Sequence, residues 1–324
     1  MPSWTMRAAL LSLSALASLA KATNILISND DGWATAQIRQ QFDTLNSTGY
    51  NSGSCYLFAD LQVVLSAPAL DQSGRGSLSK TPEPLTEPCE FNTCPAGSPA
   101  FGSDSNNPRL NYVNGYPVDA ARYGIQTLAK QFFASGQPDF VVSGPNVGPN
   151  LGLTVLLSGT IGAACEAARS GIPAGAFSGM SGAQVSYTTL STDPNSTASR
   201  AARIYADLTA TFVDALTTSP AARASDALLP PGVIVNVNYA AVDACAGGAA
   251  SYGWVLSRLV WNLFETDVER CGARRLPTES SVVGAGCYAS VSVVDAKSKL
   301  DVSASVQAEV LERLQGLPLS CLPS

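Results

Sequence analysis

The sequence predicts an α/β fold built on a doubly wound, mostly parallel sheet. Short apolar runs typical of buried parallel strands alternate with longer stretches of helical periodicity. Alternation of this kind favours a parallel sheet with helices on both faces. Polar clusters directly follow three of the predicted strands. Because ligands of such folds bind outside the carboxyl ends of the strands, these clusters are expected to share one edge of the sheet.

The predicted elements alternate from residue 24 to residue 238. Strands are predicted at 24–28, 61–68, 138–143, 171–177 and 233–238, and helices at 36–45, 118–133, 161–169 and 200–217. The chain from 80 to 111 is rich in Pro, Ser, Asn and Gly, which predicts an excursion or lid. Beyond residue 240 the pattern weakens, except for a last predicted helix at 302–314.

The N-terminal segment is typical of a secretory signal. Arg7 precedes the apolar stretch 8–20, and Ala20-Lys21-Ala22 is a small-residue cleavage site. A short membrane anchor is the alternative, but the run is too short and too weakly apolar to span a bilayer comfortably. We therefore expect a secreted protein, cleaved near Ala22, with no membrane attachment afterwards. The sequons at Asn46 and Asn195 then predict glycosylation.

Secretion permits disulfides, and all eight cysteines follow the cleavage site. Cys89 and Cys94 are close enough to close a small loop. Cys165 lies in an apolar predicted helix and is expected to be a buried thiol. Four cysteines cluster near the C-terminus and are expected to pair there: Cys245, Cys271, Cys287 and Cys321. The expected organisation is a signal peptide (1–22), a core (23–240) and a Cys-containing C-terminal extension (241–324) that packs on the core or on a partner subunit.

The composition excludes several mechanisms. The chain contains no histidine, so Ser-His-Asp and Cys-His hydrolases, His-ligated catalytic zinc and His-based phosphatases are excluded. The net charge is -6 and no basic run stands out, which disfavours binding to nucleic-acid polymers. An acidic protein can still bind a phosphate ester if a metal ion supplies positive charge at the site.

Asp30 and Asp31 form the first polar cluster, between the first predicted strand and Gly32. Two adjacent carboxylates repel each other unless a cation bridges them or one takes up a proton. The alternative is helix capping, because acidic residues also stabilise the first turn of a helix.

The later clusters offer neutral oxygen ligands and amides. Ser73 presents a hydroxyl, and Asn146 and Asn150 present amide oxygens, although all three residue types are also common in turns. Ser158-Gly159-Thr160 precedes a predicted helix, where amides and hydroxyls can bind a phosphate or simply cap the helix. Oxygen ligands of these kinds suit Mg²⁺, Mn²⁺ or Ca²⁺.

Taken in order, these blocks resemble those of the SurE-like (survival protein E) phosphatases. The resemblance covers residues 24 to 239, about two thirds of the chain. The blocks that carry it are 28–32, 66–68 with 72–74, 143–146 with Gly148 and Asn150, 158–160 with 162–164, and 236–238.

The resemblance implies a Rossmann-like fold and hydrolysis of nucleoside monophosphates or other phosphomonoesters. It also implies homodimers or homotetramers. A divalent metal, Mg²⁺ or Mn²⁺ first, would be held by the residues Asp30, Asp31, Ser73 and Asn146. Phosphate contacts would come from Asn150, Ser158, Gly159 and Thr160.

The hypothesis is therefore a metal-dependent phosphomonoester hydrolase of the nucleotidase or acid-phosphatase type, with Asp30 and Asp31 as catalytic residues. Either carboxylate can orient a water molecule or move its proton, or Asp30 can act as a covalent nucleophile. The alternative is a secreted nucleotide- or metal-binding protein without turnover. A dinucleotide oxidoreductase is disfavoured because the first strand is not followed by Gly-x-Gly-x-x-Gly.

Overall fold

The computed structural model describes residues 23–47, 61–225, 227–260 and 266–323. The predicted signal peptide, residues 1–22, lies outside them. None of the helices in these ranges has the length and apolar character needed to cross a lipid bilayer.

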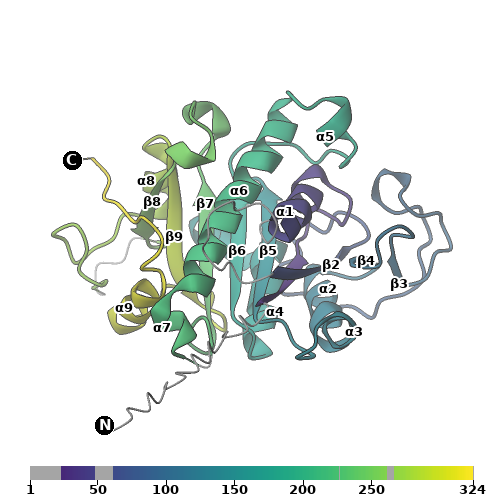
Figure 1. Ribbon diagram of the computed structural model, residues 1–324, viewed down its shortest axis with the longest axis horizontal. Coiled ribbons are helices and arrows are strands. Elements are labelled where there is room, and N and C mark those ends of the chain that lie inside the picture. Colours follow the sequence, from purple (N-terminus) through teal and green to yellow (C-terminus); the bar gives the residue numbers. More distant parts are fainter. Residues whose placement is uncertain (1–22, 48–60, 226, 261–265, 324) are drawn as a thin grey trace, which may run out of the picture.

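In the described residues, nine strands form one sheet with the order β3-β4-β2-β1-β5-β6-β7-β9-β8 (Figure 1). The six strands β4, β2, β1, β5, β6 and β7, in their order across the sheet, run parallel to one another. At the two ends of this series, β3 runs antiparallel to β4 and β9 runs antiparallel to β7. The predicted doubly wound, mostly parallel sheet is thus confirmed. The strands are β1 (Thr23–Ser28), β2 (Leu61–Pro68), β3 (Phe101–Ser103), β4 (Leu110–Val113), β5 (Phe140–Val147), β6 (Ala174–Gly179), β7 (Val233–Tyr239), β8 (Gly253–Ser257) and β9 (Tyr288–Asp295).

Helices cover both faces of the sheet. Side chains of a strand point alternately to either face, and both faces are apolar here, so each must be covered. In β1, Ile25 and Ile27 join one apolar core and Leu26 joins the other. This is why the buried strands are continuous apolar runs. The first face is covered by α1 (Ala36–Ser47) and α6 (Thr197–Thr218), and the second by α2 (Pro117–Tyr123) and α4 (Gly159–Arg169). The remaining α-helices are α3 (Ala129–Phe132), α5 (Thr189–Thr192), α7 (Pro220–Arg223), α8 (Glu279–Gly284) and α9 (Ala304–Arg313).

The structure corrects several predicted boundaries. The helix predicted at 118–133 consists of α2, a π-helical turn (Gly124–Leu128) and α3. A Cβ on Gly124 would lie 2.6 Å from Leu26 Cδ1, so the chain approaches β1 closely at this break. The strand predicted at 138–143 begins later and ends later, because β5 starts at Phe140, continues to Val147 and pairs with β6 there.

Two regions hold strands that the sequence pattern does not predict. The excursion at 80–111 contains β3 and the first half of β4, and the C-terminal region contains β8 and β9. β9 pairs with β7 along seven residues, so the region beyond residue 240 extends the sheet of the core.

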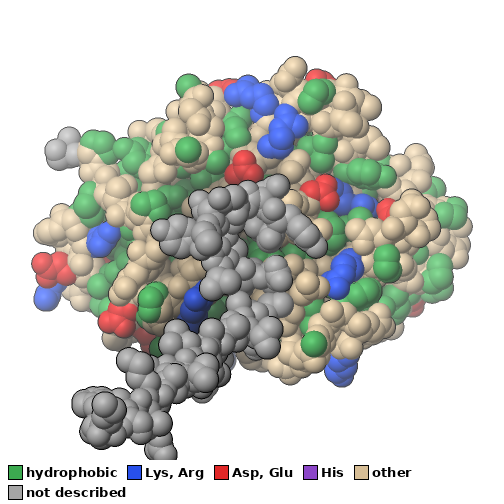
Figure 2. Space-filling model, viewed as in Figure 1, with side chains coloured by type: hydrophobic (Ala, Val, Ile, Leu, Met, Phe, Trp, Pro, Cys, Tyr) green, Lys and Arg blue, Asp and Glu red, His purple; other side chains and the backbone are tan. Residues whose placement is uncertain are grey.

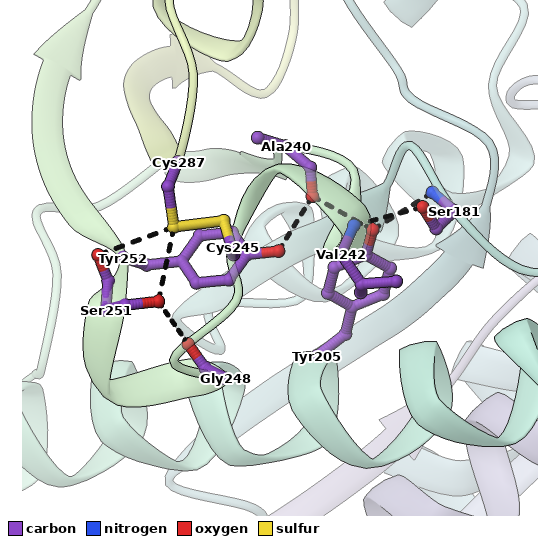
Figure 3. The surroundings of a disulfide bond; sticks show 9 residues. All are labelled: Ser181, Tyr205, Ala240, Val242, Cys245, Gly248, Ser251, Tyr252 and Cys287. Carbon is purple, nitrogen blue, oxygen red and sulfur yellow. Dashed lines mark hydrogen bonds between the residues drawn. A yellow bond between two sulfur atoms is a disulfide. The ribbon is translucent and has the colours of Figure 1, made fainter. Parts of the chain in front are cut away.

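The predicted disulfides are confirmed. Cys89 pairs with Cys94, and the four C-terminal cysteines form Cys245–Cys287 and Cys271–Cys321. Cys165 is a buried free thiol, as expected. Figure 3 shows how Cys245–Cys287 ties the chain after β7 to the start of β9. Beside it, the hydroxyls of Tyr205 and Tyr252 both donate to Ala240 O, at 3.0 and 2.9 Å, and fix the end of β7.

Candidate active site

Asp30 and Asp31 lie in the turn at the carboxyl end of β1, and both are buried. The backbone N–H of Gln72 donates to Asp30 O at 2.8 Å, which ties this turn to the chain after β2. α1 begins only at Ala36, so neither carboxylate caps that helix. Gly32 has a positive φ of 103°, and a Cβ there would lie 2.1 Å from Glu90 Oε2, so the turn requires glycine.

Asp30 is held by the N-terminus of α4. The Thr160 hydroxyl donates to Asp30 Oδ1 at 2.6 Å, and the backbone of Thr160 also hydrogen-bonds this carboxylate. A Cβ on Gly159 would lie 2.8 Å from Asp30 Cβ and 2.9 Å from Asp30 Oδ2. The helix end can therefore reach the carboxylate only because residue 159 has no side chain.

Asp31 is held by the end of β5 and by the chain after β6. Its Oδ2 accepts from the Val147 N–H at 2.8 Å, and its Oδ1 accepts from Gln184 Nε2 at 2.7 Å. The same Gln184 nitrogen lies 3.2 Å from Asp71 Oδ1 and 3.4 Å from Ser73 Oγ. Ser73 in turn donates to Asp71 Oδ1 at 2.6 Å. Three oxygens thus converge on one amide nitrogen that has only two hydrogens to donate.

Asn146 lies beside this group, one position before Val147. Its side-chain nitrogen donates to Gly148 O at 2.7 Å and to Val147 O at 3.2 Å. Its Oδ1 makes no hydrogen bond within the described part of the chain. The structure therefore brings Asp31 and Ser73 together at Gln184 and joins Asn146 to Asp31 through Val147, whereas the Asp30 carboxylate is bonded by Thr160.

The predicted phosphate-binding residues lie on the other side of Asp30. Ser158 caps α4, since its Oγ accepts from the Ile161 N–H at 3.2 Å. Asn150 is buried; its Nδ2 donates to Ser178 Oγ at 2.7 Å and, over a long 3.4 Å, to Thr160 Oγ1. Thr160 thus orients Asp30, while the Gly159 N–H is left without an intrahelical partner, as in any first helical turn.

Burial sets the electrostatics of the two carboxylates. It raises the pKa of Asp30 from 3.8 to about 6. It also raises the pKa of Asp31 well above its ordinary value, and the neighbouring charge of Asp30 adds to this shift. Between described residues, no Lys or Arg forms an ion pair with either carboxylate. Burial and mutual repulsion therefore favour proton uptake by the pair, and a cation that joins it would oppose this.

A hard divalent cation fits this set of donors. No cluster of three or more His, Cys, Asp or Glu side chains in the described ranges is arranged to hold a metal. Ligands beyond the two carboxylates must therefore be hydroxyl and amide oxygens, which Mg²⁺ and Mn²⁺ accept and structural zinc sites rarely use. Among the oxygens gathered around Gln184 Nε2, the Ser73 hydroxyl is of this kind.

Comparisons with known proteins place this chain in a family. The family described as Survival protein SurE matches residues 25–257. The chain belongs to the SurE family. It is 33% identical to an acid phosphatase of Yarrowia lipolytica over 320 residues, which cover 90% of this chain and 84% of that protein. The resemblance drawn from the sequence blocks is thus confirmed.

Other relatives match shorter regions. The chain is 37% identical to a 5'-nucleotidase SurE of Methanosarcina barkeri over 154 residues, 47% of this chain and 46% of that protein, so it spans about half of that relative's length. The crystal structure of a SurE protein from Aquifex aeolicus matches with a TM-score of 0.53 at 21% identity, over 85% of this chain and 94% of that one. This last match supports the fold alone.

Several residues of the site are not predicted by the sequence pattern. Asp71 lies two positions before Ser73, and its carboxylate beside a predicted ligand was an available signal. Gln184 follows β6 in a polar segment with no spacing signal. Glu90 lies against Gly32 from the Cys89–Cys94 loop; burial raises its pKa to about 8, and its Oε2 has no hydrogen-bond partner.

A cavity of about 290 Å³ lies near the site but includes none of the predicted site residues. Its wall contains Trp33, Tyr112 and Tyr187, together with residues of the 80–111 excursion. Arg39 also lines it and stacks at 4.7 Å from the ring centroids of both Trp33 and Tyr187. The aromatic faces nearest Arg39 are therefore already occupied.

Proposed function

We propose that this chain is a divalent-metal-dependent phosphomonoester hydrolase of the acid-phosphatase or nucleotidase type. The observation that carries the proposal is the buried pair Asp30–Asp31, with the N-terminus of α4 packed directly on Asp30. A cation and a helix N-terminus side by side form a site for a phosphate dianion. The named activities of the SurE-family relatives, acid phosphatase and 5'-nucleotidase, agree with this chemistry.

Asp30, Asp31, Ser73 and Asn146 would hold the metal. When bound, a metal ion of this kind polarises a phosphoryl oxygen and lowers the pKa of a bound water. The protein's own contribution is to hold the two carboxylates in fixed orientations, Asp30 by Thr160 and Asp31 by Val147 and Gln184. Asp30 would then orient the attacking water or accept its proton. Alternatively, its carboxylate would attack phosphorus and displace the alcohol of the ester, and water would then hydrolyse the aspartyl phosphate.

Charge on the phosphoryl oxygens would be stabilised by groups around the start of α4. The Gly159 N–H has no intrahelical partner, and the Ser158 hydroxyl keeps its own hydrogen free because its oxygen is the capping acceptor. The bond from Asn150 to Thr160 is long, so a phosphate oxygen would compete with Thr160 for that amide hydrogen.

We further propose that the mature protein is secreted and acts as a homodimer or homotetramer on nucleoside monophosphates or other phosphomonoesters. Nucleic-acid polymers are not expected as partners. On the face shown in Figure 2, basic and acidic side chains lie interspersed among neutral ones. Substrate attraction would then depend on the metal rather than on a basic surface.

Phosphate release from nucleoside monophosphates and an aryl phosphate tests the proposal. Each substrate is assayed with EDTA and again after Mg²⁺ or Mn²⁺ is restored. Release that chelation abolishes and metal rescues is the expected result. If folded protein binds metal and nucleotide in calorimetry but releases no phosphate with either ion, the chain is a binding protein without turnover and the hydrolase proposal is wrong.

A further inference from the structure

We propose that Glu279, at the start of α8, is a positioning residue that holds Asn150 in place for phosphate. The inference rests on the proposed function. Glu279 lies beyond the span that matches the family, which ends at residue 257. It connects the C-terminal region to the candidate active site through hydrogen bonds between buried groups.

The first contacts are made by the carboxylate itself. Glu279 is fully buried. Its Oε1 accepts from Asn236 Nδ2 at 2.7 Å, and its Oε2 accepts from the Gly152 N–H at 3.0 Å. One carboxylate thus bridges the middle of β7 and the loop that carries Asn150.

Asn236 passes this constraint to Asn150. Its Nδ2 also donates to Asn150 O at 2.9 Å, and Asn238 Nδ2 donates to the same oxygen at 3.0 Å. Asn238 Oδ1 accepts from the Asn150 N–H at 2.8 Å. The backbone N–H and carbonyl of Asn150 are therefore both held, and Glu279 accepts the second hydrogen bond of Asn236 Nδ2.

The same series of bonds reaches the catalytic carboxylate. The side chain of Asn150 contacts Thr160, whose hydroxyl donates to Asp30. Without Glu279, the Gly152 N–H and one hydrogen of Asn236 Nδ2 would be buried without acceptors, which costs more than the bonds themselves contribute. We expect the loop to shift so that these groups reach water, and Asn150 to shift with it.

The test compares Glu279→Ala and Glu279→Gln with Asp301→Asn. Asp301 is a matched control because it is a carboxylate of the same C-terminal region, accepts from the Leu259 N–H at 2.8 Å, and has no hydrogen bond to the Asn150 network. The readouts are the inhibition constant of inorganic phosphate, KM and kcat for one phosphomonoester, and Tm.

We expect Glu279→Ala to weaken phosphate inhibition and raise KM about tenfold, the effect of about one lost hydrogen bond between buried groups. Glu279→Gln keeps one acceptor and should lie between Glu279→Ala and the wild type. Asp301→Asn should lower Tm while phosphate inhibition and KM stay within about twofold. If Asp301→Asn raises KM as much as the Glu279 variants do, the effect is general loosening and the proposal is wrong.

A double-mutant cycle with Asn236→Ala checks the route and does not depend on Glu279→Ala being well folded. If Glu279 acts through Asn236, Glu279→Gln should add little to the loss of phosphate affinity that Asn236→Ala already causes. Additive losses would overturn the relay. An active wild type with unchanged phosphate affinity in both Glu279 variants would refute this inference alone, whereas an inactive wild type would refute the proposed function.

Discussion

The carboxylates of Asp30 and Asp31 accept hydrogen bonds only from neutral groups in the described part of the chain: a hydroxyl, a side-chain amide and backbone N–H groups. Neutral donors offset only part of the cost of removing a charge from water, and each carboxylate also lies in the field of the other. The pair is therefore a source of instability in the metal-free protein and a source of affinity for a divalent cation.

The substitution Asp30→Asn separates these two effects. The amide oxygen can still accept from Thr160, but it brings no charge for a metal or a reacting water. We expect kcat to fall about a hundredfold to ten-thousandfold. Because a buried charge has been removed, Tm measured in EDTA should not fall. Steady-state kinetics and calorimetry on the same preparation check both statements, and near wild-type turnover would contradict the site assignment.

The raised pKa values predict how the stability of the metal-free protein depends on pH. A carboxyl whose pKa is higher in the folded state binds its proton more tightly there, so folding is favoured while the proton is bound. That stability is lost as the pH rises from the unfolded value, 3.8, through about 6 for Asp30 and higher still for Asp31. In EDTA, Tm should therefore fall from about pH 5 to about pH 8.

Bound metal should oppose this loss, because metal binding releases the protons and strengthens as they leave. The difference in Tm with and without Mn²⁺ is thus expected to widen as the pH rises. Asp30→Asn is the control and should show a smaller widening. A difference that is constant over this range would mean that the two carboxylates do not bind the ion.

Only part of this site can be predicted from sequence. Asp30 and Asp31 follow a buried strand, and that position alone indicates a ligand-binding edge. Gln184 is 153 positions from Asp31, and Glu279 is 127 positions from Gly152. A hydrogen bond between residues so far apart in sequence leaves no trace in local periodicity. Gln and Glu are also mostly exposed in proteins, so their identity alone does not indicate a buried role.

At the scale of elements, α4 is brought to Asp30 by a glycine. Gly159 occupies the first helical position, where Asp30 and Pro117 leave no room for a Cβ. Ala has a higher helix propensity than Gly, so propensity alone favours the substitution and packing opposes it. The substitution Gly159→Ala therefore shows whether activity depends on the stability of the helix or on the position of its N-terminus.

We expect Gly159→Ala to lower kcat/KM about a hundredfold, the effect of displacing a binding group by about 1 Å. Gly284→Ala is the matched control, because a Cβ at this helical glycine meets nothing within 4 Å. Kinetics of the two variants at equal folded fraction make the comparison. If both retain full activity, the approach of α4 to Asp30 has no role in the reaction.

Strands and helices of the core were predictable because their apolar periods are long and regular. The buried apolar run of β1, followed by alternating helix-like and strand-like stretches, predicts a parallel sheet. β3 has three residues and β8 has five, too few for a period to stand out. The eight residues of β9 do alternate, but Gly286 and Cys287 precede them, and the strand's partner, β7, lies about fifty residues earlier.

At the scale of the whole molecule, β9 determines how the C-terminal region attaches to the core. It lies between β7 and β8, so within the described sheet β8 pairs with no strand other than β9. Glu279 lies just before β9 in the same region. The stability of the sheet edge and the position of Asn150 therefore both depend on residues beyond 257.

This arrangement predicts the effect of a truncation at the end of the family match. A chain of residues 23–257 retains β7 and β8 but lacks the strand that joins them, so the edge of β7 is exposed and β8 is unpaired. Buried side chains of β9, Val291 and Val293 among them, are lost from the core as well.

We expect no cooperative thermal transition for this truncated chain and aggregation in size-exclusion chromatography. Cys245→Ser should be included so that the thiol left by the loss of Cys287 is not the cause. A soluble truncated chain with a cooperative transition would show instead that the core folds without β9. If that chain also bound phosphate as tightly as the full chain, residues 23–257 would be sufficient for phosphate binding.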